Sequence, residues 1–269
     1  MPKNFHISII TVNLNNIEGL KRTMQSVFEQ TWKDFEYIII DGGSIDGSRE
    51  AIESSKGRID YWVSEPDKGI YNAMNKGIAV ASGEYLLFLN SGDHFTDDGI
   101  LARNHKFLGD EDLIYFDIRV VKNDAEYVRR FPDKLVFSYF TKYTLPHQAT
   151  FIKVDLFKRT GYYDEGLKIV SDWKFFLESI CDCKASYLKV NEILSIHYLD
   201  GVSTDPENWD LVLEERRKVL ESKYSFFLED SQQIFKYREQ ISILESKISI
   251  LRKSRKIGLL IKLGLLNKF

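Results

Sequence analysis

Residues 64–93 read SEPDKGIYNAMNKGIAVASGEYLLFLNSGD, and this stretch decides the class of fold. Its residues 84–89 are almost wholly apolar, which is typical of a strand covered on both faces of a sheet. The run ends abruptly in the polar turn NSGD at residues 90–93. Ligands of open α/β sheets bind outside the carboxyl ends of the strands. We therefore expect Asp93 to lie where a metal-bound phosphate would be held.

Strand and helix patterns alternate through the first half of the chain. This alternation predicts parallel βαβ units with right-handed crossovers and hence an α/β fold. The second half mixes strand patterns with one clear helix pattern. The predicted strands are 7–12, 35–40, 59–63, 84–89, 113–121, 126–131, 185–190 and 193–197, and the predicted helices are 17–30, 46–56, 68–80 and 171–180.

Length and composition bound the function. The chain has 269 residues and a formal net charge of -3, which fits one large domain, or one domain with an appendage, and argues against a nucleic-acid binder. Its cysteines, Cys181 and Cys183, lack the further ligands of a zinc site and are interpreted as reduced thiols of a cytosolic protein. We expect neither a signal peptide nor a membrane-spanning helix, because no long uninterrupted apolar run is present.

After residue 205 the strand patterns stop. Residues 207–223 and 230–256 have helical patterns, and beyond Glu245 every charged side chain is basic. A narrow apolar seam with the heptad spacing of a coiled coil runs through the second helix and comprises Ile234, Tyr237, Ile241, Leu244, Ile248 and Leu251. The sequence therefore predicts a domain at 1–205 and a helical tail at 206–269. The tail would bind a membrane surface, a second copy, or the domain that precedes it in its own chain.

Four polar segments follow predicted strands or open a predicted helix: 11–16, 41–47, 90–93 and 171–173. Each has a purely structural alternative. Asp46 can cap a helix, and an aspartate such as Asp172 is favourable at a helix N-terminus. Their joint occurrence in this order favours a chemical site.

The ordered motifs SIITVNLN (8–15), IIIDGGSIDGS (38–48), residues 64–93, LPHQATF (145–151) and IVSDWKFFL (169–177) carry a family resemblance. Over residues 5–205 the chain resembles the family 2 glycosyltransferases, an inverting group with the GT-A fold, and above all bacterial enzymes that build O-antigen, capsule or exopolysaccharide. The resemblance implies hexosyl or N-acetylhexosaminyl transfer from a nucleotide-sugar to a saccharide acceptor that is expected to be lipid-linked. It also implies a cytoplasmic enzyme, peripheral at the inner face of the cytoplasmic membrane.

The resemblance implies a Mn²⁺ or Mg²⁺ cofactor with Asp93 as its main protein ligand. The family often has Asp-x-Asp at this turn, whereas Asn90 or Ser91 replaces the earlier acid here, which predicts weaker metal binding. Asn90 and Ser91 are expected to contact the nucleotide-sugar. His197 resembles the late histidine that completes metal or diphosphate binding in some relatives. Its alternative is a strand-end histidine bonded to backbone.

By the same resemblance, Asp41 places the nucleobase and ribose, and Thr11 and Asn13 line its pocket. Gly42 stands where many relatives have a second acid, so uracil is not implied. Further donor contacts are expected from a turn aspartate and the helix after it, namely Asp67, Asn72 and Lys76. For Asp67, a simple cap or turn role is the alternative.

Asp172 matches the acid that takes the proton from the acceptor hydroxyl, because the family places this general base in a Glu-Asp or Ser-Asp pair at a helix start. Trp173 could offer an apolar face to a sugar ring. His147 and Gln148 match an acceptor-side His-Gln, although a lone histidine is more commonly a packed one.

The sequence argues against two other functions. A nucleotidyltransferase should carry a Gly-rich basic phosphate loop after the first strand, and residues 11–16 contain neither glycine nor a basic residue. A non-catalytic assembly protein dimerising through its tail would have no need of Asp93 and Asp172.

Overall fold

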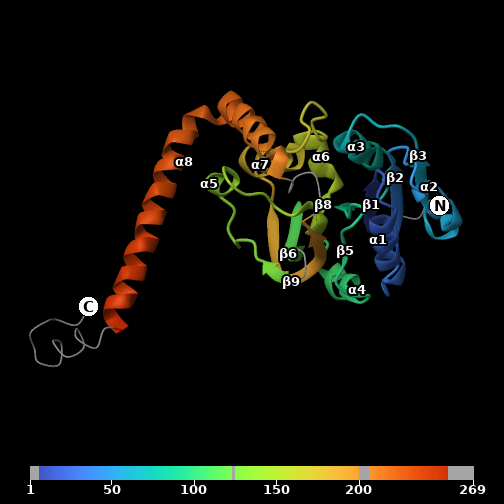
Figure 1. Ribbon diagram of the computed structural model, residues 1–269, viewed down its shortest axis with the longest axis horizontal. Coiled ribbons are helices and arrows are strands. Elements are labelled where there is room, and N and C mark those ends of the chain that lie inside the picture. Colours follow the sequence, from blue (N-terminus) through green and yellow to red (C-terminus); the bar gives the residue numbers. More distant parts are fainter. Residues whose placement is uncertain (1–5, 123–124, 200–205, 254–269) are drawn as a thin grey trace, which may run out of the picture. The chain divides into compact units, whose positions relative to one another are not determined.

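The computed structural model describes residues 6–122, 125–199 and 206–253 (Figure 1). The chain divides into two compact units, of which the first ends at Val219 and the second begins at Leu220. The domain boundary predicted after residue 205 adjoins residues outside the described ranges and stays a prediction. The first unit is an α/β structure built on one nine-stranded sheet.

The first half of the chain forms the parallel part of the sheet. Its strands lie in the order β3-β2-β1-β4, and each neighbouring pair is parallel, as the alternation of strands and helices predicts. Helix α3 packs against β1 and β2. The elements of this half are β1 (Ile7–Asn13), α1 (Ile17–Glu29), β2 (Phe35–Asp41), α2 (Ser48–Ser54), β3 (Tyr61–Ser64), α3 (Ile70–Val80) and β4 (Tyr85–Phe88).

The second half extends the same sheet as β8-β6-β9-β5 with mixed directions. Strand β8 is antiparallel to both β4 and β6, so it reverses the chain direction in the middle of the sheet. Strand β9 is parallel to β6, while β5 and β7 pair antiparallel with β9 and β6. These strands are β5 (His94–Phe95), β6 (Leu113–Lys122), β7 (Ala125–Arg129), β8 (Thr150–Lys153) and β9 (Tyr187–Tyr198).

Strand β9 differs from the sequence prediction of two strands at 185–190 and 193–197. It is one strand with an irregular register beside Phe116 and Asp117, where its pairing passes from Val190 directly to Ile193. The polar pair Asn191-Glu192, which interrupts the apolar pattern, is therefore accommodated by a bulge rather than by a turn.

The remaining helices are α4 (Ile100–Asn104), α5 (Phe137–Phe140), α6 (Val154–Thr160), α7 (Ser171–Cys181) and α8 (Trp209–Lys253). Helices α6 and α7 lie side by side (Figure 1), and the rings of Phe157 and Phe175 stack at 4.5 Å between centroids. The sequence predicts two helices, at 207–223 and 230–256. In the structure α8 covers both of them as far as Lys253, and within it Tyr224 departs from helical backbone angles and marks a kink.

The register of the parallel strands aligns their polar ends. Asn13 pairs with Asp41, and Asp41 pairs with Ser64, so the last residues of β1, β2 and β3 form a row across the sheet. The last residues of β4 lie beside Ile10, and the polar turn at 90–93 follows directly. This edge is where the candidate site is built.

Candidate active site

The row of strand ends is joined by hydrogen bonds centred on Asp41, which is fully buried. Asn13 Nδ2 donates to Asp41 Oδ1 at 2.7 Å, and Ser64 Oγ donates to Oδ2 at 2.6 Å. Ser44 donates to both carboxylate oxygens through its hydroxyl and its backbone amide. Burial alone would raise the pKa of Asp41, but the bonds from Ser44, Ser64 and Asn13 outweigh burial and hold this pKa below its ordinary value. The carboxylate is therefore a fixed negative acceptor at the sheet edge.

Gly42 and Asp67 lie against each other. A Cβ placed on Gly42 would come within 2.4 Å of Asp67 Oδ2, so a side chain at position 42 and the present Asp67 position exclude one another. The other oxygen of Asp67 accepts from the Gly69 amide at 2.8 Å in a turn. Asp67 thus brings a carboxylate next to the residue that follows Asp41, where many relatives carry their second acid.

The turn at 90–93 is tied to α1 and to β9. Thr23 of α1 accepts from the Gly92 amide and donates to the Asp93 carbonyl, at 3.0 and 2.7 Å. Gly92 has φ of +109°, a backbone angle that favours glycine. Asp93 Oδ1 lies 2.7 Å from His197 Nδ1, although the two residues are 104 positions apart. The histidine predicted from the late motif therefore contacts the predicted metal-binding aspartate.

The Asp93–His197 pair fits a divalent cation that is also bound by phosphate. Hard cations such as Mg²⁺ take one or two carboxylates and complete their shell with substrate oxygens and water. In the described part of the chain no group of three or more His, Cys, Asp or Glu side chains could hold a metal by itself. The buried amide oxygen of Asn90, in the same turn, has no hydrogen-bond partner among the described residues. A cation bound by Asp93 and His197 would therefore have coordination positions left for substrate oxygens and water.

Asp172 lies in the first turn of α7 with both of its carboxylate oxygens bonded. Tyr71 donates its hydroxyl to Oδ1 at 2.9 Å, and His147 Nδ1 lies 3.2 Å from Oδ2. Burial alone would raise the pKa of Asp172, but His147 and then Tyr71 outweigh burial and lower it. Burial opposes charge on His147, yet the neighbouring Asp172 raises the pKa of this imidazole. The carboxylate is therefore ionised and its orientation is fixed.

Asn90 connects the two groups of acidic side chains. Its amide nitrogen lies 3.3 Å from His147 Nε2, while His147 Nδ1 faces Asp172. Asn90 belongs to the same turn as Asp93. The ionised Asp172 and the Asp93–His197 pair are thus linked through two side chains, with the strand-end carboxylate of Asp41 at the same edge of the sheet.

Comparison with known proteins decides the family. The sequence profile of glycosyl transferase family 2 matches residues 8–163. The chain belongs to this family. It is 37% identical over 185 residues to an uncharacterized glycosyltransferase of Mycobacterium tuberculosis, covering 66% of this chain and 70% of that protein. A PGL/p-HBAD biosynthesis glycosyltransferase of Mycobacterium bovis is 32% identical, with coverage of 62% and 67%. The chondroitin synthase of Pasteurella multocida is 26% identical over 94% of this chain but 28% of its own length.

Solved structures show the same fold. S. aureus TarS 1-349 in complex with UDP-GlcNAc has a TM-score of 0.56 at 16% identity, covering 71% of this chain and 58% of that chain. The mannosyltransferase PcManGT of Pyrobaculum calidifontis, in complex with GDP-Man and Mn2+, has a TM-score of 0.57 at 12% identity, with coverage of 89% and 81%. The glycosyltransferase therefore has the GT-A fold that the sequence resemblance implies.

Two predicted site residues of the glycosyltransferase lie in the core. Thr11 is fully buried, and its hydroxyl donates to the Leu89 carbonyl at 2.7 Å, so it ties β1 to the segment after β4. Trp173 is 1% exposed; its indole N–H donates to Phe140, and the Arg216 guanidinium lies 5.0 Å from its ring centre. As placed, the Trp173 ring has no face open to a sugar.

The other predicted residues lie near the site with partners of their own. Asn72 donates to Glu165, and Lys76 pairs with Glu65 at 2.6 Å, so a donor would compete with two carboxylates for these side chains. Ser91 accepts from Asn16 through its carbonyl and its hydroxyl. Gln148 is buried next to His147 in the chain. Their predicted roles stay predictions.

Tyr71 is the residue of the site that sequence reasoning missed. It lies inside the motif at residues 64–93, but on the buried face of α3 with Met74 and Ile78, where a tyrosine is interpreted as a core residue. Its hydroxyl reaches Asp172, which is 101 positions away. A buried tyrosine hydroxyl normally has a partner, and that rule alone could have marked Tyr71 as a polar contact.

Proposed function

We propose that this chain is an inverting, metal-dependent glycosyltransferase with Asp172 as the general base. The observation that carries the proposal is the environment of Asp172. Its carboxylate is bonded on both oxygens by groups that lower its pKa, and it is linked through His147 and Asn90 to the turn that contains Asp93. A general base on one side of a site and a diphosphate-binding turn on the other are what displacement at an anomeric carbon requires.

We assign the donor to the polar edge of the parallel strands. Asp41 and Asn13 are buried as placed and would shape the nucleoside site, while Asp67 beside Gly42 would accept a hydrogen bond from the nucleoside. Asn90 and Ser91 would lie along the diphosphate. The complexes of TarS with UDP-GlcNAc and of PcManGT with GDP-Man support a nucleotide-sugar donor for this fold.

A divalent cation fits the same turn. Mn²⁺ or Mg²⁺ held by Asp93 and His197 would stabilise the negative charge that develops on the departing diphosphate. The Mn2+ present with PcManGT supports this assignment. In this chain the two side chains are already in contact across β9 and the turn at 90–93, so the protein holds its ligands together before the donor binds.

The reaction balances with a single base. The acceptor hydroxyl oxygen forms the new bond to the anomeric carbon, and the bond from that carbon to the phosphate oxygen breaks. The nucleoside diphosphate leaves with the electron pair, and Asp172 takes the hydroxyl proton. Attack opposite to the leaving group inverts the anomeric carbon. We propose a saccharide acceptor that is lipid-linked, in surface polysaccharide or glycolipid synthesis, as the PGL/p-HBAD biosynthesis relative suggests.

A ligand screen followed by product analysis tests this function. One of UDP-glucose, UDP-GlcNAc and GDP-mannose should raise the melting temperature in the presence of Mn²⁺, because binding to the folded state alone adds about 2.7 kcal/mol at a hundred times Kd. NMR of the transferred sugar should then show β-linkage from an α-linked donor. Retention of configuration, or no shift with any nucleotide-sugar, would contradict the proposal. Release of pyrophosphate from a nucleoside triphosphate and a sugar phosphate would favour a nucleotidyltransferase.

Replacing Tyr71 with phenylalanine should shift the acid limb of the pH–rate profile to higher pH. Asp172 acts as a base only when ionised, so activity falls as the pH drops through its pKa. The Tyr71 hydroxyl is one of the groups that lower this pKa against the effect of burial. Its removal raises the pKa, and the variant loses activity at a pH where the wild type is still active. The measurement is kcat as a function of pH at saturating donor.

Tyr163→Phe is the matched control for Tyr71→Phe. The ring of Tyr163 packs against that of Tyr71, but its buried hydroxyl has no hydrogen-bond partner among the described residues. The control should keep the wild-type acid limb. Equal acid limbs for Tyr71→Phe and wild type would show that the hydroxyl does not act on the base.

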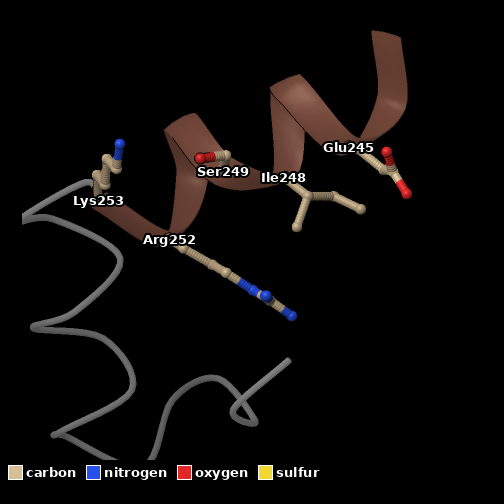
Figure 2. A pocket seen from close by; sticks show the side chains of 5 residues that line it. All are labelled: Glu245, Ile248, Ser249, Arg252 and Lys253. Carbon is tan, nitrogen blue, oxygen red and sulfur yellow. The ribbon is translucent and has the colours of Figure 1, made fainter. Parts of the chain in front are cut away.

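The described part of the tail presents an apolar seam and basic side chains. The seam residues named above are 40–56% exposed within the described chain. Figure 2 shows Ile248 of the seam and Arg252 one turn later pointing to the same side of α8. Among the described helices, none combines the length and the apolar character needed to cross a membrane. The basic and apolar residues at 254–269, which the sequence analysis assigns to the tail, lie outside the described residues.

We propose that the tail holds the enzyme at an anionic membrane surface, with pairing to a second copy as the alternative. Deleting residues 230–269 should abolish sedimentation with vesicles of phosphatidylglycerol. Basic residues near such a surface contribute about 1 kcal/mol each, and apolar side chains add burial in the interface. The deletion should leave nucleotide binding intact.

Two further variants separate the tail alternatives. Changing Lys247, Arg252 and Lys253 to glutamine should weaken vesicle binding and make it less sensitive to salt. Changing Leu244 and Ile248 to aspartate should convert a dimer to a monomer if the seam pairs two copies. A full-length protein that is monomeric and ignores the vesicles at low salt would contradict both tail functions.

A further inference from the structure

Glu215 is a buried carboxylate outside the predicted site. It lies near the start of α8, within the compact unit that ends at Val219, and is 6% exposed. A buried acid needs polar partners, because leaving water without them is costly. Among the described residues its hydrogen-bond partners are backbone amides of a loop about 45 residues earlier in the chain.

The amides that Glu215 accepts are those of the three residues at 168–170. Lys168 N donates to Oε1 at 2.7 Å, while Ile169 N and Val170 N donate to Oε2 at 3.1 and 3.3 Å. Hydrogen bonds to a carboxylate are stronger than those between neutral groups. One side chain therefore fixes the backbone of three consecutive residues.

These three residues end where α7 begins. Val170 is the residue immediately before the helix, and its own side chain makes no capping hydrogen bond. Asp172 follows two residues later, in the first turn. Free amides at a helix start are satisfied by side chains, water or ligands, and here Glu215 satisfies the amides of the segment that leads into the helix.

The loop at 168–170 is also connected to Asp172 through the hydroxyl of Tyr71. The Tyr71 hydroxyl lies 2.5 Å from the Ile169 carbonyl oxygen and 2.9 Å from Asp172 Oδ1. The amide of Ile169 is held by Glu215, and its carbonyl faces the tyrosine that bonds the base. Both the backbone before Asp172 and the hydroxyl beside it are thus tied to Glu215.

We propose that Glu215 is a positioning residue for Asp172. Its hydrogen bonds go to residues 168–170 and to no predicted donor or acceptor residue, so it acts by holding this loop in place while Asp172 and Tyr71 keep their relative placement. The inference rests on the proposed role of Asp172 as general base. A displacement of about 1 Å in a reacting group can cost about 10²-fold in rate, so a side chain that restrains this loop affects turnover without contacting substrate.

The test compares Glu215→Ala and Glu215→Gln with the control Glu214→Ala. Glu214 is the neighbouring glutamate, exposed and paired with Lys218. We would measure kcat and Kd for whichever of UDP-glucose, UDP-GlcNAc and GDP-mannose gives the largest thermal shift, and amide hydrogen exchange over 168–170. Glu215→Ala should lower kcat by about 10- to 100-fold, leave donor Kd within about twofold, and speed exchange at these amides. Glutamine retains one acceptor oxygen and should restore most of the rate; the control should match wild type.

Several results would overturn the inference. Wild-type kcat in Glu215→Ala despite faster exchange would show that the loop does not position the base. A parallel loss of kcat and donor affinity would indicate a general structural role, and so would a glutamine variant no better than alanine. If the alanine variant does not fold, the glutamine variant tests the inference. It must then show faster amide exchange over 168–170 than wild type and a lower kcat, with donor Kd unchanged. Wild-type turnover in Asp172→Asn would show that Asp172 is not the general base and would overturn the proposed function. Wild-type kcat in Glu215→Ala, together with an inactive Asp172→Asn, would overturn only the role of Glu215.

Discussion

Replacing Asp172 with asparagine should lower the rate of sugar transfer by about 10²–10⁴-fold, the usual cost of losing a general base. The amide is nearly isosteric and can still accept from Tyr71, but it cannot take a proton from the acceptor hydroxyl. Donor affinity should stay near wild type, because the donor is assigned to the strand ends and the turn at 90–93. Transfer rates and donor Kd, measured separately, check the prediction.

Asp164→Asn is the control for Asp172→Asn. Asp164 lies in the loop before α7 and pairs with Lys174 of that helix at 2.7 Å, so the change removes a nearby carboxylate without touching the base. This variant should keep its turnover. Near-wild-type turnover in Asp172→Asn would remove Asp172 from the catalytic role, and an equal loss in both variants would point to a change in the local charge rather than in proton transfer.

The strand ends of the site could be predicted from the sequence because they obey a local rule. An apolar run such as 84–89 that stops in a polar turn marks the carboxyl end of a buried strand, and parallel strands bring such ends together. Asp41, Asn13 and Asp93 follow this rule, and the structure places Asp41 and Asn13 in one hydrogen-bonded row. The placement of Asp172 in the first turn of a helix was equally local.

The facing of side chains on these strands could not be predicted. Every residue of β1 is buried, so the alternation that separates an inner from an outer face is absent. Thr11 was therefore expected in the donor pocket, whereas it bonds Leu89 within the sheet. Trp173 raises the same difficulty on a helix, because an aromatic residue in the first turn can face either a ligand or the core.

Contacts between distant segments were also beyond the sequence. Strand β8 lies between β4 and β6, and its four residues share the pairing with these two strands. No local sequence pattern predicts this arrangement. The contact of Gly42 with Asp67 is likewise tertiary. Position 42 itself carries no acid, but the carboxylate of Asp67, from another loop, lies beside it.

Replacing Asp93 with alanine should weaken nucleotide-sugar binding in Mn²⁺ by at least about tenfold and matter little in EDTA. Removing even supporting groups around a metal typically costs about 10- to 100-fold in affinity, and Asp93 is the carboxylate assigned to the cation. Without metal, both proteins lose this contribution, so their donor affinities should converge. Donor Kd across a Mn²⁺ titration, by calorimetry, gives the measurement.

The choice of variants separates metal binding from folding. Asp93 is buried and contacts His197, so the alanine variant also leaves an unpaired histidine. Asp93→Asn keeps the size of the side chain and should show the same loss in Mn²⁺. Asp97→Ala removes an exposed carboxylate of the same segment that pairs with Arg103, and should bind donor as wild type does. Donor affinities of Asp93→Asn and wild type that coincide at every Mn²⁺ concentration would exclude the assignment, since a ligand to the cation cannot be lost without changing the metal dependence of binding.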